Sequence, residues 1–299
     1  PNVFVPLTED RARWDAVPGE IAAVEKQLAT RAAAARPDFD QWLTTVSAEA
    51  PKDVSSGLAL HLPLNEPDGP LRGIVDGQAR EWPAALTRID APLGKAPVIS
   101  DAPVDLGDLG SFSRGEQVSF GGFVRIEGKP TGAIIARMNP GESYRGWDLY
   151  LQNGQPASHV IDTWDRAANK IVAPAPLASG EWHHVIVTFD GKSAANQASA
   201  IYVDGKRADA QVVPASVGGT IETAVPLRLG SRHNNDSKLN GKVALQDFRF
   251  YRRLLSPEEI GSLANDSLLR QVVSLPPDQR TKVQLDALFG HFISNIDAP

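Results

Sequence analysis

The feature that most constrains the fold is a series of short apolar segments between residues 57 and 255, each bounded by Gly, Pro or Asp. The segments are 58–62, 118–124, 133–136, 147–151, 185–189 and 200–203. Such short runs are typical of β-strands, and Asn153-Gly154, Asp190-Gly191 and Asp204-Gly205 are typical of tight hairpin turns. No helical pattern of comparable length interrupts the series, so the sequence predicts an antiparallel sandwich rather than a sheet with crossover helices.

Helical patterns flank this β-rich part on both sides. In the first fifty residues Ile21, Val24 and Leu28 recur at three- and four-residue spacing, and we expect that helix to end at Arg36-Pro37. Its alanines 32–35 could belong to a partner-binding helix, but the spacing favours packing on neighbouring elements. After residue 255, Ser256-Pro257-Glu258-Glu259 combines an N-cap, a first-turn Pro and a capping box, and a last helix follows Pro276-Pro277.

The terminal helices contain large apolar side chains that need burial, so we expect these helices to pack on each other or on the sandwich. Those side chains are Phe39, Trp42, Leu43, Phe289 and Phe292. The chain is therefore divided into an N-terminal helical segment (1–56), a sandwich domain (57–255) and a C-terminal helical segment (256–299).

Composition excludes several classes of function. With 36 acidic and 30 basic residues the net charge is −6, which is unfavourable for a nucleic-acid partner. The chain has no Cys, so it forms no disulfide and no thiolate metal site. No apolar run approaches the ~20 residues of a membrane span. Because the chain begins Pro1-Asn2-Val3, without Met or a signal peptide, we expect it to be a piece of a longer protein.

Four motifs in order resemble the laminin G-like, concanavalin A-like jelly rolls. The segment 180–191, followed by Ile201-Tyr202-Val203-Asp204-Gly205, resembles the paired central strands of that family. Residues 226–232 resemble its next strand, and residues 241–256 resemble its closing strand and exit turn. The resemblance implies a mainly β fold, an antiparallel jelly-roll sandwich with flanking N- and C-terminal α-helices.

A narrower resemblance concerns Arg145-Gly146-Trp147-Asp148-Leu149, the flanking helices and the Arg280-Thr281 helix. These are similar to a region of large secreted planctomycete proteins that carry a cytochrome c-type module. This resemblance implies export, to a secreted, periplasmic or cell-surface location, and a multidomain parent. It implies no established activity.

The laminin G-like resemblance also raises the question of calcium, which many members of that family hold with loop carboxylates and backbone carbonyls. A carboxylate is common at the position before the Asp247 equivalent, but here that residue is Gln246, a weaker ligand. Asp105, Asp108 and Asp236 are other possible ligands. We therefore predict no cofactor, with calcium as the alternative.

The sequence carries only weak catalytic signatures. Hydrolases on this fold usually present two carboxylates from one strand as Glu-x-Asp-x-Glu, and no such string occurs. The adjacent His183 and His184 point to opposite faces of a strand, so they cannot readily share one metal ion. We therefore expect no enzymatic activity.

Aromatic and hydrogen-bonding residues gather in the turn-rich part between Met138 and Lys170, with a second polar loop at residues 232–235. An aromatic plane beside Asp, Asn or Arg suits a sugar, whose C–H face packs on the ring and whose hydroxyls bond to the polar groups. The predicted ligand-binding residues are Tyr144, Arg145, Trp147, Asp148, Trp164, Asp165 and Arg232. The alternative for Trp147 is a place in the core, which its alternation with Leu149 and Leu151 favours. The alternative for Trp164 is a ring folded back under its own loop, with the indole N–H bonded to a carbonyl, and for Arg232 a solvated turn.

These observations predict a non-catalytic recognition module of a larger secreted protein, binding carbohydrate or a protein surface. The alternative is a structural spacer whose helices dock the neighbouring domains of its parent. A polysaccharide-active enzyme is a third interpretation, disfavoured by the missing pair of carboxylates.

Overall fold

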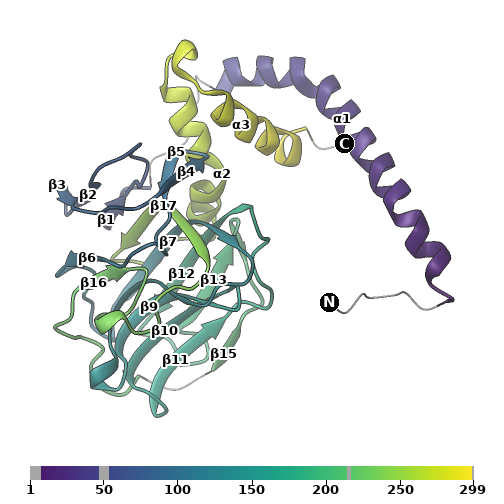
Figure 1. The fold of residues 1–299 in the computed structure, drawn as a ribbon. Coiled ribbons are helices and arrows are strands. Elements are labelled where there is room, and N and C mark those ends of the chain that lie inside the picture. The colour runs from purple at the N-terminus through teal and green to yellow at the C-terminus, as the bar shows by residue number, and fades with distance from the viewer. Residues whose placement is uncertain (1–7, 47–53, 214–216, 298–299) are drawn as a thin grey trace. The chain divides into compact units, whose positions relative to one another are not determined.

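The computed structural model describes residues 8–46, 54–213 and 217–297. The chain forms two compact units (Figure 1). The sandwich unit comprises Pro51–Val272, and the helical unit comprises Pro1–Ala50 with Val273–Pro299.

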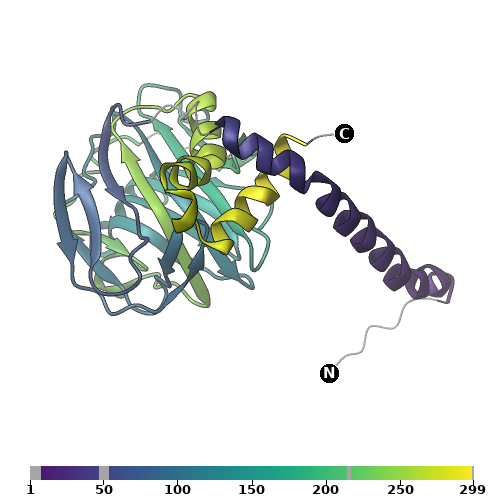
Figure 2. The same ribbon diagram turned by 90° about the horizontal axis from the view of Figure 1, so that it is seen from above.

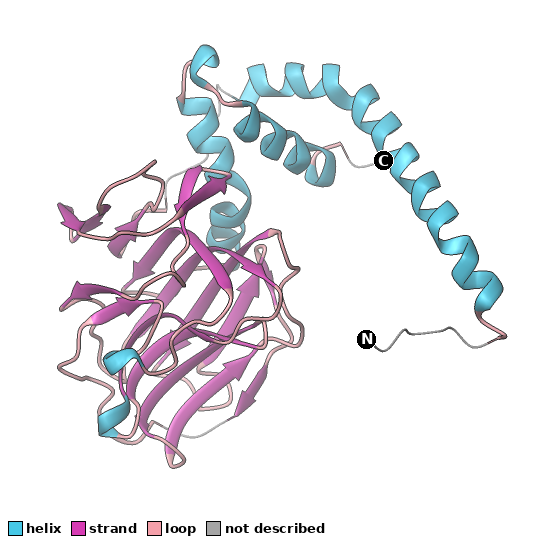
Figure 3. Ribbon diagram, in the orientation of Figure 1, coloured by secondary structure: helices cyan, strands magenta, loops and turns pink. Residues whose placement is uncertain are grey.

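Two antiparallel sheets form the sandwich unit, as the sequence predicts (Figure 3). In spatial order the eight-stranded sheet contains β14 (Lys206–Arg207), β13 (Ser199–Val203), β12 (Trp182–Asp190), β7 (Gln117–Glu127), β17 (Lys242–Tyr251), β1 (Leu58–Leu62), β2 (Leu71–Val75) and β3 (Gln78–Trp82). The seven-stranded sheet contains β15 (Gln211–Val213), β11 (Ala167–Val172), β10 (Gln155–Thr163), β9 (Arg145–Gln152), β8 (Gly132–Asn139), β16 (Leu227–Leu229) and β6 (Val104–Gly107). A separate hairpin joins β4 (Arg88–Ala91) to β5 (Gly94–Pro97). Each of the six predicted segments lies within a strand.

Two of the three predicted hairpin turns are tight turns. Asn153 and Gly154 have φ of 53° and 80°, and Asp204 and Gly205 have φ of 50° and 77°. These left-handed conformations match the twist of the flanking strands. The prediction for Asp190-Gly191 is wrong, because β12 ends at Asp190 and β13 begins only at Ser199. The Asp190 carboxylate instead orders the longer connection, since it accepts hydrogen bonds from Lys192 N (3.0 Å) and Ser193 Oγ (2.7 Å).

Alternation along the strands fills the space between the two sheets with apolar side chains. Trp147 lies at the centre of this core with its ring centroid 4.5 Å from Phe120 and 5.4 Å from Phe250. The indole of Trp147 donates a hydrogen bond from Nε1 to the carbonyl of Gly110 (2.7 Å), so its polar atom is satisfied as well.

Helix α2 (Pro257–Ser274) packs on the sandwich through a second apolar cluster. Ile260 and Leu263 are fully buried there with Ile186, Tyr202 and Tyr251. The predicted capping box is confirmed, because Glu259 N donates to Ser256 Oγ (3.2 Å) and Ser256 N donates to a Glu259 carboxylate oxygen (2.9 Å). Three short 3₁₀ turns complete the elements: η1 (Pro140–Glu142), η2 (His233–Asn235) and η3 (Pro277–Gln279).

The helical unit contains α1 (Arg11–Val46) and α3 (Lys282–Asn295), and α3 lies against the C-terminal half of α1 (Figures 1 and 2). The prediction that the first helix ends at Arg36-Pro37 is wrong, since α1 continues through Pro37 for more than two turns. Packing beyond the proline compensates for its lost hydrogen bond: the Phe39 ring lies 5.1 Å from Phe289 and 5.6 Å from Phe292. The expected packing of the terminal helices on each other is confirmed. Among the described helices none is long and apolar enough to cross a membrane.

Replacing Phe39 with Ala should selectively destabilise the helical unit. Phe39 is 1% exposed and contacts three other rings, so the lost packing should lower the free energy of unfolding of this unit by about 3–5 kcal/mol. Thermal unfolding followed by far-ultraviolet circular dichroism measures the effect. Thr30→Ala, at an exposed position of the same helix, is the control and should change little. Equal melting curves for the Phe39→Ala and Thr30→Ala variants would contradict the packing of α1 on α3.

Candidate functional site

The candidate site lies on the outer face of the seven-stranded sheet, where β9 pairs with β10. Side chains alternate along β9, so Trp147 and Leu149 enter the core while Asp148 and Tyr150 belong to the opposite face. The tight turn at Asn153-Gly154 sets the register of this hairpin and places Asp148 directly opposite His159. We call the cluster of Tyr144, Asp148, Tyr150, His159, Trp164 and Arg232 the outer-face site.

A buried charge network forms the base of this site. Asp148 Oδ1 lies 2.8 Å from His159 Nδ1, and Asp148 Oδ2 accepts hydrogen bonds from Arg232 Nε (3.0 Å) and Nη2 (2.7 Å). Asp148 is 0%, His159 4% and Arg232 7% exposed. Burial alone would raise the pKa of Asp148, but the charges and hydrogen bonds of His159 and Arg232 outweigh it and hold the pKa at about 2. Asp148 therefore stays ionised and holds the side chains of His159 and Arg232 in position.

Aromatic rings surround the guanidinium group of Arg232. Its central carbon lies 5.3 Å from the Tyr144 ring centroid and 5.0 Å from that of Tyr150, both within cation–π range. The Trp164 ring lies 5.8 Å from Tyr144 and 6.0 Å from His159. Both tyrosines are half-buried, whereas Trp164 is 40% exposed. The site is thus an aromatic surface of tyrosine and tryptophan supported from below by paired charges.

Left-handed backbone conformations hold the loops that carry these rings. Ser143 and Tyr144 have φ of 54° and 60°, and Asp165 has φ of 68°. The two loops are joined by a hydrogen bond from Trp164 N to the carbonyl of Ser143 (2.9 Å). Positive φ is costly for a bulky residue such as Tyr144, so the surrounding structure must hold it in place.

The structure brings together four of the seven predicted ligand-binding residues: Tyr144, Asp148, Trp164 and Arg232. Arg145 lies at the rim, where its guanidinium pairs with Glu142 (3.2 Å) and Asp162 (3.5 Å). Asp165 is exposed in the β10–β11 turn next to Trp164.

Three of the predicted ligand contacts need correction. Trp147 is 1% exposed and belongs to the core, because strand alternation points it away from the outer face. Asp148 and Arg232 belong to the site, but their burial leaves them almost no surface for a ligand. They position the aromatic rings instead, and Arg232 is not a solvated turn residue.

Sequence reasoning missed Tyr150 and His159. A signal for both was present, because a two-residue turn at Asn153-Gly154 pairs residue 152 with 155 and hence 148 with 159. Period-two alternation then places Tyr150 on the same face as Asp148.

The residues considered for calcium are engaged in other interactions. Gln246 accepts from Leu93 N and donates to the carbonyl of Lys95, both at 3.0 Å, while Asp247 pairs with His61 Nε2 at 2.6 Å. Asp108 pairs with Arg137 at 2.6 Å. Among the residues that the structure describes, no group of three or more His, Asp or Glu side chains lies close enough to hold a metal ion. The donor side chains that the structure describes therefore do not fit a calcium site.

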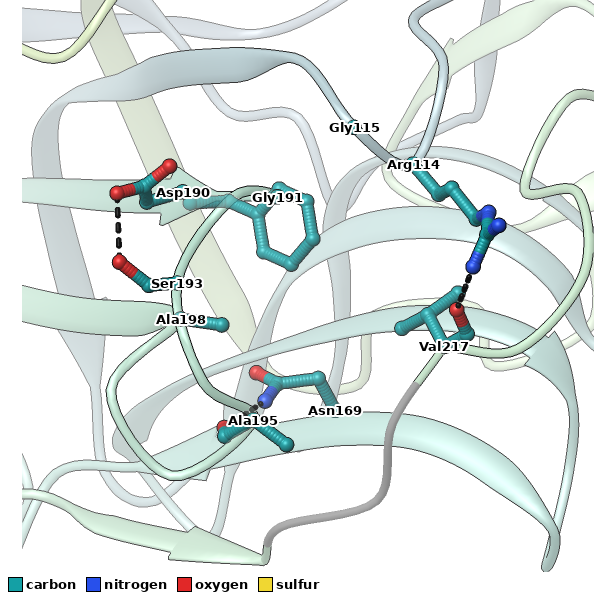
Figure 4. A pocket seen from close by; sticks show the side chains of 10 residues that line it. Arg114, Gly115, Asn169, Asp190, Gly191, Ser193, Ala195, Ala198 and Val217 are labelled. Carbon is teal, nitrogen blue, oxygen red and sulfur yellow. Dashed lines mark hydrogen bonds between the residues drawn. The ribbon is translucent and has the colours of Figure 1, made fainter.

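A separate hollow of about 370 Å³ is lined by the segment before β7, by β11 and by the connection from β12 to β13 (Figure 4). Its polar groups bond within the protein: Asn169 Nδ2 donates to the carbonyl of Ala195 (2.8 Å), and Arg114 donates to the carbonyl of Val217 (3.1 Å). Asp190 likewise accepts from Ser193 (2.7 Å). These side chains order the loops around the hollow, so the outer-face site is the stronger candidate.

The low pKa of Asp148 gives a pH dependence of stability. In the unfolded chain the Asp148 carboxylate takes up a proton near the ordinary carboxyl pKa of 3.8, but in the folded chain only near 2. The contribution of ionised Asp148 to the free energy of unfolding is therefore complete above about pH 4. The free energy of unfolding should fall by about 2 kcal/mol as the pH drops from about 4 to below 2. Urea unfolding followed by tryptophan fluorescence at several pH values measures it, with Asp148→Asn as the comparison. Parallel stability profiles for the two proteins would contradict the ion pair.

The comparisons with known proteins agree with this architecture. A sequence profile described as the "Concanavalin A-like lectin/glucanases superfamily" matches residues 100–261. No curated protein matches the sequence significantly.

Solved structures with a similar fold include two binding domains. One is the binding domain of Paraclostridial Mosquitocidal Protein 1, with 15% identity and a TM-score of 0.56 over 72% of this chain and 53% of that one. The other is the receptor binding domain of botulinum neurotoxin mosaic serotype C/D, with 17% identity and a TM-score of 0.50 over 73% of this chain and 52% of that one. The chain thus spans about half the length of these structures, and the likeness concerns the fold alone. Since the profile takes in more than half of the sequence and includes β7 to β13 and β17, the chain belongs to the concanavalin A-like lectin/glucanase superfamily.

Proposed function

We propose that this chain is a non-catalytic carbohydrate-binding module that holds its ligand on the outer-face site. The observation that carries the proposal is the indole of Trp164, which is 40% exposed yet fixed beside Tyr144 by the backbone bond to Ser143. A large ring kept in water by a rigid loop is unfavourable for solubility, and a ligand that covers it removes that cost.

The surroundings of Trp164 suit a sugar. The C–H face of a sugar ring packs on an indole or phenol ring, and half-buried Tyr144 extends that surface beside Trp164. Hydroxyl groups need donors and acceptors at the rim, which Arg145, Asp162 and Asp165 supply. The membership of the superfamily, whose description names lectins, supports the same ligand class.

The carboxyl groups support a binding role over hydrolysis. A glycosidase needs one carboxylic acid with a raised pKa to protonate the leaving group. In the part of the chain that the structure describes, every carboxyl pKa that is displaced is lowered: Asp148, Asp190, Asp204, Asp247, Glu258 and Glu259. We therefore propose that the chain binds glycan without cleaving it.

Our proposal for the setting of the module rests on its resemblance to secreted multidomain proteins. We propose that it is exported, to a secreted, periplasmic or cell-surface location, and that it forms one part of a larger protein. The spacer alternative predicts that the chain binds no soluble glycan at all.

Removing the exposed ring should abolish most of the glycan affinity. A glycan array identifies a ligand, and isothermal titration calorimetry then compares the parent chain with Trp164→Ala, whose affinity should be roughly tenfold weaker. Ile74→Ala is the control, because Ile74 is also a large, exposed apolar residue (46%) but lies on β2 of the eight-stranded sheet. Unchanged affinity in Trp164→Ala would show that the glycan does not bind at the outer-face site. If no glycan on the array binds the chain, the result would favour the structural spacer.

Incubation with α- and β-glucans should release no reducing sugar above a buffer blank. Release that disappears when one acidic residue is replaced by its amide would overturn the non-catalytic proposal. The amide variants Asp162→Asn and Asp165→Asn are the first to examine, since they lie at the rim of the outer-face site.

A further inference from the structure

The N-terminal half of α1 exposes a continuous apolar stripe. Its members are Trp14 (60% exposed), Val17 (36%), Ile21 (52%), Val24 (52%) and Leu28 (59%). They follow one another at intervals of three, four, three and four residues, so they lie on one side of the helix. We call these five side chains the α1 seam. Scattered apolar residues on a surface need no explanation, but a stripe of five in register does.

The α1 seam continues a surface that is covered further along the same helix. Ala35 and Trp42 follow Leu28 at seven-residue steps, Ala35 is buried, and the Trp42 ring packs 5.2 Å from Phe292 of α3. The part of α1 that α3 covers ends near Arg31. The guanidinium of Arg31 pairs at 3.1 Å with the carboxylate of Asp297, which lies just beyond the end of α3. Within the helical unit, the ribbon views show the rest of α1 without a neighbouring helix (Figures 1 and 2).

Local sequence gives this half of α1 little helical stability of its own. Pro18 and Gly19 both lie inside the helix and disfavour it, by roughly 3 and 1 kcal/mol relative to Ala. In proteins most of the stability of a helix comes from the packing of its apolar face against a neighbour. The seam therefore needs a partner that covers it.

We propose that the α1 seam pairs with the α1 seam of a second copy of this chain, the two helices running antiparallel. Alternating steps of three and four residues define the contact line of two helices in a left-handed coiled coil. The partner must then present an equally long seam with the same period, and α1 itself has one. In α2 and α3 the large apolar side chains Ile260, Leu263 and Phe292 are already packed.

One antiparallel register places each of the five side chains of the α1 seam opposite a residue of the second copy. If Ile21 lies opposite Val24 of the second copy, then Val17 lies opposite its Leu28. Trp14 comes to lie over the long aliphatic stem and guanidinium of the second copy's Arg31, a favourable cation–π contact.

The flanking charges favour the antiparallel direction. In a parallel pair Glu20 of one helix would lie beside Glu25 of the other, which places like charges together on both sides. In the antiparallel register Glu20 lies beside Gln27 of the second copy, whose amide can donate a hydrogen bond to the carboxylate. This pairing does not depend on the proposed glycan site, but it would present two such sites on one particle and raise the avidity for a repeating ligand.

Sedimentation velocity of the intact chain over a range of concentrations tests the pairing. A species of twice the 32.1 kDa chain mass should be present at micromolar concentration. Ile21→Glu/Val24→Glu places four carboxylates in the contact, keeps good helix formers, and should weaken association by roughly a hundredfold or more. Ala22→Glu/Ala29→Glu adds the same charge away from the seam and should leave the dimer intact. A monomer at every concentration, or a dimer that survives the seam substitutions, would overturn the proposal.

Cross-linking tests the direction, which is simple because the chain has no Cys. A mixture of Val17→Cys and Leu28→Cys chains should form a disulfide between the two variants under mild oxidation. Trp14→Cys chains alone should not, because the two Trp14 positions lie about 25 Å apart in the antiparallel register. Efficient cross-linking of Trp14→Cys to itself would show a parallel pair and overturn the proposed arrangement.

Discussion

The ion pair between Asp148 and Arg232 holds the outer-face site together. Asp148 has no exposed surface, and its two oxygens are shared between His159 and Arg232. Replacing either partner alone would leave a buried charge unsatisfied, which costs more than the pair itself contributes. Because the guanidinium also lies within cation–π range of Tyr144 and Tyr150, the position of both rings depends on this one carboxylate.

The neighbouring core and outer face are built from the same strand. Trp147 and Asp148 are consecutive, yet one fills the interior of the sandwich and the other anchors a polar network on the opposite side. A shift of one residue in the β9–β10 register would place a charged side chain in the core and an indole outside. The tight turn at Asn153-Gly154 therefore sets both the packing of the sandwich and the composition of the site.

Much of the fold could be predicted from the sequence, because strands, tight turns and the α2 capping box depend on a few adjacent residues. The wrong predictions concern features that depend on tertiary packing. Pro37 is a strong local stop signal, but the rings of α3 stabilise the turns of α1 that follow it. The role of Arg232 could not be read from its polar loop, since Asp148 is separated from it by 84 residues and meets it only through the order of strands in the sheet.

The left-handed backbone at Tyr144 has a consequence for how this surface can change during evolution. Its φ of 60° disfavours β-branched side chains, and glycine would relax the backbone but remove the ring. The loop is thus confined to few sequences and presents a surface of fixed shape. New ligand preferences would then arise from substitutions of rim residues such as Arg145 and Asp165, while the loop itself stays the same.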